Sequence, residues 1–154
     1  MMKQHDVHDI LGCTPQQAWI VFTNQTDLPW LGMLREGFRH CFVLIHDGEH
    51  WISVDPMANY MEVVVHNVPA HFDLCAWLQE RGHHVIEAEL TQSIKRSAPI
   101  MLFTCVEACK RILGIHKRSI LTPWQLYRHL EAQRQEQAHL QHTEIHKGEY
   151  AWEA

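Results

Sequence analysis

Three consecutive segments with the composition of β-strands, separated by short turns, constrain the fold most strongly. Residues 38–45 and 51–54 are rich in β-branched and aromatic side chains, and residues 60–66 (YMEVVVH) follow them closely. Asp47-Gly48 lies between the first two segments, and Asp-Gly is the strongest short-range signal for a β-hairpin. Strands joined by such short connections pair antiparallel. The sequence therefore predicts an antiparallel meander in the middle of the chain.

Further strands and helices are predicted on both sides of this meander. Residues 17–24 and 83–90 have strand composition, and residues 71–81 are predicted to form a helix that ends at Gly82. Thr122-Pro123 begins a last helix with a capping-box pattern. Residues 25–37 are predicted to form a loop whose apolar side chains cover the core, namely Leu28, Trp30, Leu31 and Leu34. Hairpin-connected strands flanked by helices predict an α+β fold.

Chain length and polarity predict one domain with a polar extension. A chain of 154 residues with 46% hydrophobic residues can bury a single core. We assign residues 1–132 to that domain. Residues 133–154 are mostly polar and are predicted to form a C-terminal tail, or an extension of the last helix, that projects from the domain or is mobile.

Composition excludes several classes of partner. The formal net charge is −5 and the basic residues form no stripe, so we expect no nucleic acid partner. No apolar run approaches the roughly 18 residues of a membrane span, and no secretory leader is recognised, so we expect a cytoplasmic protein without a membrane span. The five cysteines are widely spread and include no C-x-x-C, so we expect no metal site, no disulfide framework and no cofactor.

Cys105 is the candidate nucleophile. An apolar run at residues 101–103 is predicted to be extended, and the following residues have helical spacing, with Val106 and Cys109 on one side and Gly114 at the C-terminus. Cys105 then lies in the first helical turn, where unpaired backbone N–H groups and the helix dipole stabilise a thiolate. The alternative is that Cys105, like Cys109, is a small apolar core residue.

A candidate general base and an acid to orient it lie in the predicted hairpin. A two-residue turn at Asp47-Gly48 sets His40 directly across from Asp55. A turn at Gly48-Glu49 instead sets Asp55 across from Phe42, on the same face as His40. Both registers therefore place imidazole and carboxylate on one face of the sheet. A carboxylate beside His40 can fix the tautomer of the ring, and a basic imidazole can activate a thiol.

Two other carboxylates, Glu62 and Glu87, are candidates for the orienting acid, but their predicted strand positions place them less well. The alternative interpretation of His40 and Asp55 is a polar pair at a strand end without a catalytic role.

The order of these motifs resembles the circularly permuted NlpC/P60 group of papain-like cysteine hydrolases. In that group a strand that begins with His precedes the nucleophile, the nucleophile opens a Cys-x-Glu helix, and a TP-x-x-L segment follows. The matching segments, within residues 18–130, are GFRHCFVLI, WISVDP, LFTCVEACKRILGI and ILTPWQLYRHL. The chain departs from the group's pattern in having Thr104 before the Cys and Cys41 where a valine-like residue is usual.

The resemblance implies a papain-like fold and a peptidase- or amidase-type activity. Cys105 would be the nucleophile, His40 the general base and acid, and Asp55 the orienting residue, with a peptide, amide or ester as the substrate. The competing function is a non-catalytic papain-like module that binds or assembles, for instance in a phage particle.

Overall fold

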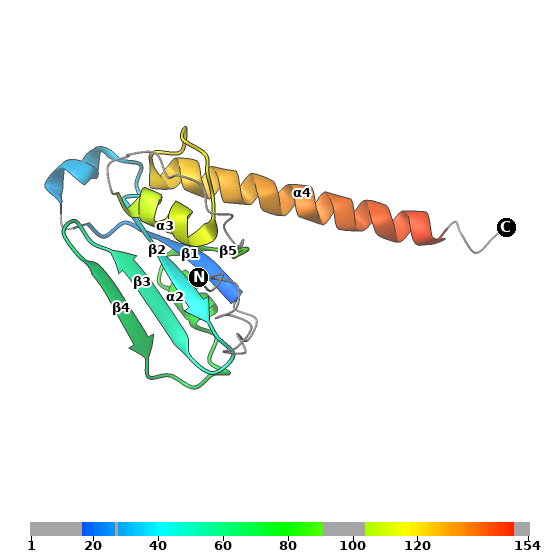
Figure 1. The fold of residues 1–154 in the computed structure, drawn as a ribbon, viewed down its shortest axis with the longest axis horizontal. Helices are drawn as coiled ribbons and strands as arrows, with labels where there is room; N and C mark the ends of the chain where they lie inside the picture. Colours follow the sequence, from blue (N-terminus) through cyan, green and yellow to red (C-terminus); the bar gives the residue numbers. More distant parts are fainter. Residues whose placement is uncertain (1–16, 27, 91–103, 150–154) are drawn as a thin grey trace, which may run out of the picture.

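The computed structural model describes residues 17–26, 28–90 and 104–149, with the backbone alone for residues 142–149 (Figure 1). In chain order its elements are β1 (Gln17–Thr23), the 3₁₀ helix η1 (Pro29–Met33), β2 (His40–His46), β3 (Trp51–Pro56), β4 (Met61–His66), α2 (Leu74–Glu80), β5 (His84–Ala88), α3 (Cys105–Leu113) and α4 (Pro123–Glu149). The extended run predicted at residues 101–103 lies outside the described residues.

The described strands form one five-stranded sheet in the order β4-β3-β2-β1-β5. All four neighbouring pairs are antiparallel. The predicted meander is therefore confirmed as β2-β3-β4, and β1 and β5 extend the sheet on its other side. Helices accompany the sheet, so the α+β class is also confirmed.

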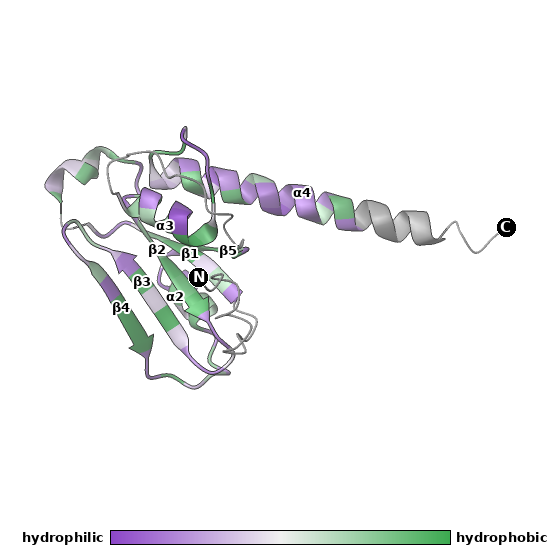
Figure 2. Ribbon diagram, in the orientation of Figure 1, coloured by the Kyte–Doolittle hydropathy of each residue, from purple (hydrophilic) through white to green (hydrophobic). Residues whose placement is uncertain are grey.

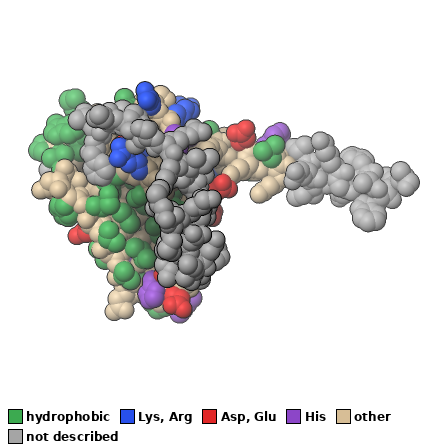
Figure 3. Space-filling model, in the orientation of Figure 1, with side chains coloured by type: hydrophobic (Ala, Val, Ile, Leu, Met, Phe, Trp, Pro, Cys, Tyr) green, Lys and Arg blue, Asp and Glu red, His purple; other side chains and the backbone are tan. Residues whose placement is uncertain are grey.

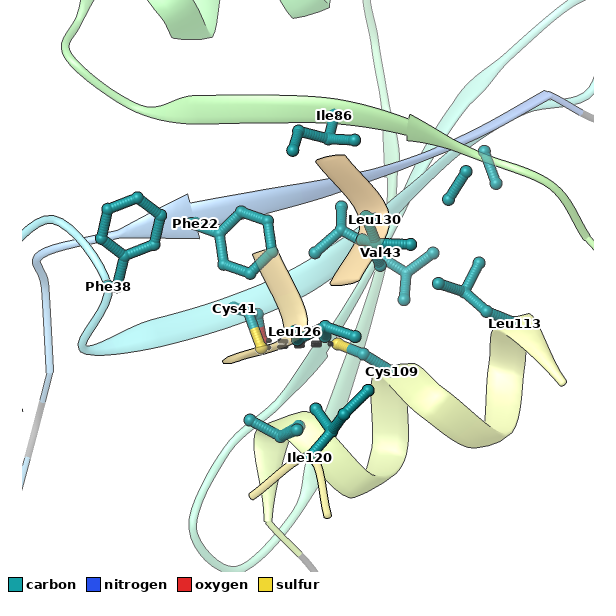
Figure 4. Close-up of a cluster of buried hydrophobic side chains, with 14 residues drawn as sticks. Phe22, Phe38, Cys41, Val43, Ile86, Cys109, Leu113, Ile120, Leu126 and Leu130 are labelled. Carbon is teal, nitrogen blue, oxygen red and sulfur yellow. Dashed lines mark hydrogen bonds between the residues drawn. The ribbon is translucent and has the colours of Figure 1, made fainter. Parts of the chain in front are cut away.

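Alternating side chains along the strands build two apolar clusters, one on each face of the sheet. On one face, strand residues such as Phe22 and Val43 pack with Cys109 of α3 and Leu126 of α4 (Figure 4). On the other face, Leu44 and neighbouring residues pack with α2. Each fully buried side chain of this size contributes about 1.5–3 kcal/mol to stability. The sheet is thus sandwiched between α3 and the start of α4 on one side and α2 on the other.

The first turns of α4 are attached to the domain by aromatic contacts. The ring centroid of Phe38 lies 4.8 Å from those of both Trp124 and Tyr127, and Tyr127 packs edge-on against Phe22 at 5.5 Å. Leu130 is the last buried residue of the helix among those whose side chains the structure describes. Beyond it, α4 projects from the domain and runs to Glu149 (Figure 1), and the coloured part of this projection is mostly hydrophilic in Figure 2. Within the described part of the chain, no helix combines the length and apolarity that crossing a membrane requires.

Two predictions about local structure need correction. Helix α2 begins at Leu74 rather than at residue 71, because the Asp73 side chain caps it by accepting the Ala76 N–H at 2.8 Å. The loop of residues 25–37 contains η1, and not all of its apolar side chains cover the core. Trp30 is 65% exposed, since η1 buries none of its residues.

Helix α3 is held at both ends and along one side. The Thr104 hydroxyl caps its start by accepting the Glu107 N–H at 3.2 Å, and Gly114 ends it at φ 70°, in the left-handed region. Helical spacing alone predicts Glu107 on the side away from the core, but it is buried with Lys110. The Lys110 ammonium donates to Glu107 at 2.9 Å and to the Ile120 carbonyl at 3.3 Å, which ties α3 to the segment before α4.

We predict that Glu107→Ala lowers the free energy of unfolding by about 3 kcal/mol, because it leaves the buried Lys110 ammonium without its carboxylate. Urea denaturation of the two proteins measures this difference. Although burial opposes it, hydrogen bonds from Lys110 and Arg111 hold the pKa of Glu107 below its ordinary value. The Glu107 contribution is therefore present above the unfolded pKa of about 4.3 and is lost as the pH falls through the lower folded pKa.

The matched control is Arg134→Ala, which removes the more exposed ion pair with Glu131. We expect it to cost less than about 1 kcal/mol. Equal losses in the two variants would contradict the structural role assigned to the buried pair.

Candidate functional site

The observed hairpin register is the second of the two predicted registers. Val43 pairs with Val54 and His46 pairs with Trp51. The Asp47 N–H donates to the His50 carbonyl at 3.2 Å, so Gly48-Glu49 forms the tip of the turn, with Gly48 at a φ of 103°. Extending this register by one residue places Asp55 opposite Phe42 rather than opposite His40. Asp55 and His40 are therefore diagonal neighbours on one face of the sheet.

This diagonal arrangement brings the imidazole and the carboxylate into a short hydrogen bond. The His40 Nε2–H donates to Asp55 Oδ1 at 2.6 Å. The two side chains retain only 15% and 22% of their exposure, so water screens this contact weakly. Because Nε2 is engaged by the carboxylate, Nδ1 is the ring nitrogen left to exchange a proton with another group.

The two alternative acids occupy other positions. Glu62 lies directly opposite Asp55 on β4, one strand further from His40. Glu87 pairs with Trp19 from β5, which is separated from the His40 strand β2 by β1. Of the three predicted carboxylates, Asp55 is the one that the structure brings into contact with His40.

Cys105 is the first residue of α3, directly after the capping residue Thr104. The Thr104 at this position, a departure from the NlpC/P60 pattern, is thus the residue that starts the helix. Cys105 interacts with Cys41 and with His40, the first two residues of β2. A hydrogen bond with the Cys41 side chain, the His40 imidazole and a backbone hydrogen bond from Cys41 lower the pKa of Cys105 to about 5, although burial acts in the opposite direction.

The pKa of His40 is raised, whereas that of Cys105 is lowered. Burial by itself lowers the pKa of His40, but the hydrogen bonds and negative charges of Asp55 and Cys105 outweigh it and raise the pKa to about 10. Between these two pKa values the thiolate and the imidazolium stabilise each other. A pKa of about 5 for Cys105 and of about 10 for His40 favours a thiolate beside an imidazolium at neutral pH, with Asp55 bound to Nε2 of the ring.

Cys41 is a member of the site that the sequence interpretation did not identify. Its side chain is fully buried, and the Cys109 Sγ lies 3.8 Å from its sulfur and 3.7 Å from its carbonyl oxygen (Figure 4). The signal in the sequence was the spacing of Cys105 and Cys109, which lie one helical turn apart and so face the same strand. This spacing identifies Cys41 as a neighbour only when α3 is known to pack on β2.

The structure also contains a groove that lies away from this site. A groove of about 560 Å³ is lined by residues that include Ala18, Glu89, Leu113 and Gln137. Ala18 and Leu113 are at the ends of β1 and α3 opposite to those near His40 and Cys105. Among the described residues, no group of three or more His, Cys, Asp or Glu side chains is placed to hold a metal ion.

Comparison with protein-family models, curated proteins and solved structures finds no match to the chain. The chemistry of the site is therefore inferred from its own geometry.

We predict that iodoacetamide labels Cys105 much faster than Cys75 at neutral pH. Cys105 is a thiolate there, whereas burial and the nearby charges of Asp73 and Glu87 raise the pKa of Cys75 to about 12. The Cys105 rate should change little between about pH 6 and about pH 8, because its thiol is already ionised throughout that range. Mass spectrometry of digested samples taken over time gives both rates from one protein.

His40→Ala should slow the labelling of Cys105 at about pH 6, because the thiolate loses its cationic partner. Circular dichroism should show that the fold remains. Equal rates for Cys105 and Cys75 in the unaltered protein would contradict the thiolate assignment.

Proposed function

We propose that the protein is a cysteine hydrolase of the peptidase or amidase type, with Cys105 as the nucleophile, His40 as general base and acid, and Asp55 as the residue that orients His40. The observation that carries the proposal is the Asp55–His40 hydrogen bond of 2.6 Å beside a Cys105 thiol of lowered pKa at a helix start. Nucleophile, base and orienting acid in this order form the arrangement that activates a thiol for acyl transfer.

In the first half of the reaction, the Cys105 Sγ forms a bond to the carbonyl carbon of an amide or ester, and the π electrons of the carbonyl move to its oxygen. The resulting tetrahedral intermediate collapses to a thioester, and the bond to the leaving group breaks. The leaving nitrogen or oxygen takes the proton from His40 Nδ1, the ring nitrogen that Asp55 does not occupy. His40 is then neutral and serves as a base in the second half.

In the second half, His40 Nδ1 removes a proton from a water molecule, which attacks the thioester carbon. The carbon–sulfur bond breaks, the carboxylic acid leaves, and the thiolate and imidazolium are restored. Throughout the cycle Asp55 accepts a hydrogen bond from the Nε2–H of His40. This bond fixes the ring so that Nδ1, which transfers the proton, points away from Asp55.

The start of α3 supplies donors for the negative oxygen of both intermediates. The Glu107 N–H is used by the Thr104 hydroxyl, and the Ala108 N–H by the Thr104 carbonyl. We assign the N–H groups of Cys105 and Val106 to the oxyanion, because the first N–H groups of a helix have no partner within it. The proposal includes a permuted papain-like architecture of the NlpC/P60 type. The order of the sequence motifs and the position of Cys105 at the start of α3 support it.

We predict that p-nitrophenyl acetate, a simple activated ester, acetylates Cys105 with a burst of one p-nitrophenol per protein molecule. Intact mass and peptide mapping should place the acetyl group on Cys105. Cys75→Ser, which alters a cysteine of α2 on the face of the sheet opposite to α3, is the matched control and should retain the burst. Loss of the burst in Cys105→Ser is expected. Absence of any acyl-enzyme in the unaltered protein would favour the non-catalytic binding or assembly module instead.

We predict that Asp55→Asn lowers kcat for p-nitrophenyl acetate by at least about tenfold, because an amide can stabilise the wrong tautomer of His40. Circular dichroism should show that the variant is folded. If Asp55 serves only to cap the turn before Pro56, Asn replaces it without loss, since the two side chains cap equally well. Glu87→Gln, on the edge strand β5, is the control. An unchanged kcat in Asp55→Asn would remove Asp55 from the mechanism and leave a Cys105–His40 pair.

A further inference from the structure

Strand β4 is an open edge of the sheet. It is the first strand in the order β4-β3-β2-β1-β5, and within the described part of the chain it has a neighbour on one side only. An edge strand presents a row of unpaired backbone N–H and C=O groups that can pair with another strand. Proteins commonly block such edges with Pro, Lys or a β-bulge. The segment Met61–His66 contains neither Pro nor Lys, and its pairing with β3 is continuous over all six residues.

The side chains of this edge strand are apolar and exposed. Val63 is 62% exposed and Val65 is 60% exposed, on the same face of the sheet as α3. Figure 1 shows α3 and α4 over β1 and β2, with β4 beyond them, and Figure 3 shows apolar side chains gathered over this part of the sheet. Val64, on the opposite face, is 37% exposed. An apolar strand of this kind gains stability when its surface is buried.

The sequence of β4 is complementary to itself in one antiparallel register. Directly opposed residues in an antiparallel pair project to the same face, so a two-fold axis perpendicular to the sheet must pass through a residue rather than between two residues. With the axis at Val64, this residue faces its own copy, and Val63 of each chain faces Val65 of the other. Glu62 of each chain then faces His66 of the other. Shifting the axis to Val63 or Val65 separates Glu62 from His66.

The charge of Glu62 favours that register. Within one chain, Glu62 lies directly opposite Asp55, and like charges in such a position repel each other. The imidazole of His66 in a second chain, donating a hydrogen bond or carrying a proton, would offset this repulsion from the other side. Its Nε2 lies 2.9 Å from the Ser53 hydroxyl, which leaves Nδ1 to meet the carboxylate. The same pairing would join the exposed valines of both chains into one apolar surface.

From this self-complementarity we propose that two copies of the chain pair antiparallel through β4, with Val64 on the two-fold axis, and form one continuous ten-stranded sheet. The pairing satisfies the free backbone groups of both edges and buries the exposed valines. Cys105 and His40 stay outside the interface, but Glu62 lies directly opposite Asp55, so the proposal is tested by association of the chains rather than by activity.

Sedimentation velocity of the full chain over a range of concentrations tests the proposal. The unaltered protein should form a dimer, and Val64→Lys should weaken it about tenfold or more, because it places two ammonium groups directly opposite each other and removes two apolar side chains. The matched control is Leu121→Lys, at an exposed apolar residue outside β4 (58% exposed), which should dimerise normally. Circular dichroism should show all three proteins folded.

A charge exchange tests the register itself. In a dimer of Glu62→Arg, the introduced guanidinium of each chain would face His66 of the other. In a dimer of His66→Glu, the introduced carboxylate of each chain would face Glu62 of the other. Each variant alone should therefore be mainly monomeric. An equimolar mixture should form a heterodimer, in which the introduced arginine of one variant faces the introduced glutamate of the other and the second pair is native. An unaltered protein that stays monomeric, a dimer that Val64→Lys does not weaken, or a mixture that does not associate would each overturn the proposal.

Discussion

The packing of α3 against the central strand β2 determines where Cys105 lies relative to His40 and Cys41. Cys109 lies on β2 with its sulfur 3.8 Å from that of Cys41, and this contact sets the first turn of α3 at the start of the strand. The buried Lys110 holds the other side of the helix through Glu107 and the Ile120 carbonyl. Because the helix is fixed along its length, Cys105 has little freedom to move away from His40. A catalytic side chain needs this kind of support from residues that do no chemistry.

The electrostatics of the site result from a balance between burial and pairing. Burial alone would make both Cys105 and His40 neutral, since it raises the pKa of a thiol and lowers that of an imidazole. Hydrogen bonds and opposite charges reverse both effects. Asp55 adds a second negative group to the imidazole, and Cys41 adds a further hydrogen bond to the thiolate. The site therefore keeps two charges at neutral pH that isolated side chains in the same surroundings would lose.

The two edge strands of the sheet, β4 and β5, differ in how much a helix covers them. At the other edge, Gln137 of α4 donates to Glu89 just beyond β5, so the long helix covers part of that side. No helix of the described chain performs this role at β4, whose residues are mostly exposed. His40 and Asp55 of the candidate site lie between these edges, on the interior strands β2 and β3, where pairing on both sides restrains the backbone.

Local patterns in the sequence determined much of this structure. The Asp-Gly turn and the strand compositions on both sides of it predict the β2-β3-β4 meander, because short connections leave only antiparallel pairing open. Alternation along the hairpin places His40 and Asp55 on one face in either register, and the helical spacing after Thr104 places Cys105 in a first turn. Each of these inferences depends on residues close together in the chain, where backbone geometry leaves few alternatives.

Tertiary structure decided what depends on contacts between distant residues. Closure of the turn at Gly48-Glu49 selected the register, so the His40–Asp55 contact is diagonal. Capping by the Asp73 side chain makes α2 begin at Leu74 rather than at residue 71. Glu107 is buried because Lys110 can reach it and the Ile120 carbonyl together, and the 3₁₀ turn leaves Trp30 in solvent. Cys41 belongs to the site only because α3 packs on β2. The positions of residues 41 and 105 in the sequence do not predict this packing.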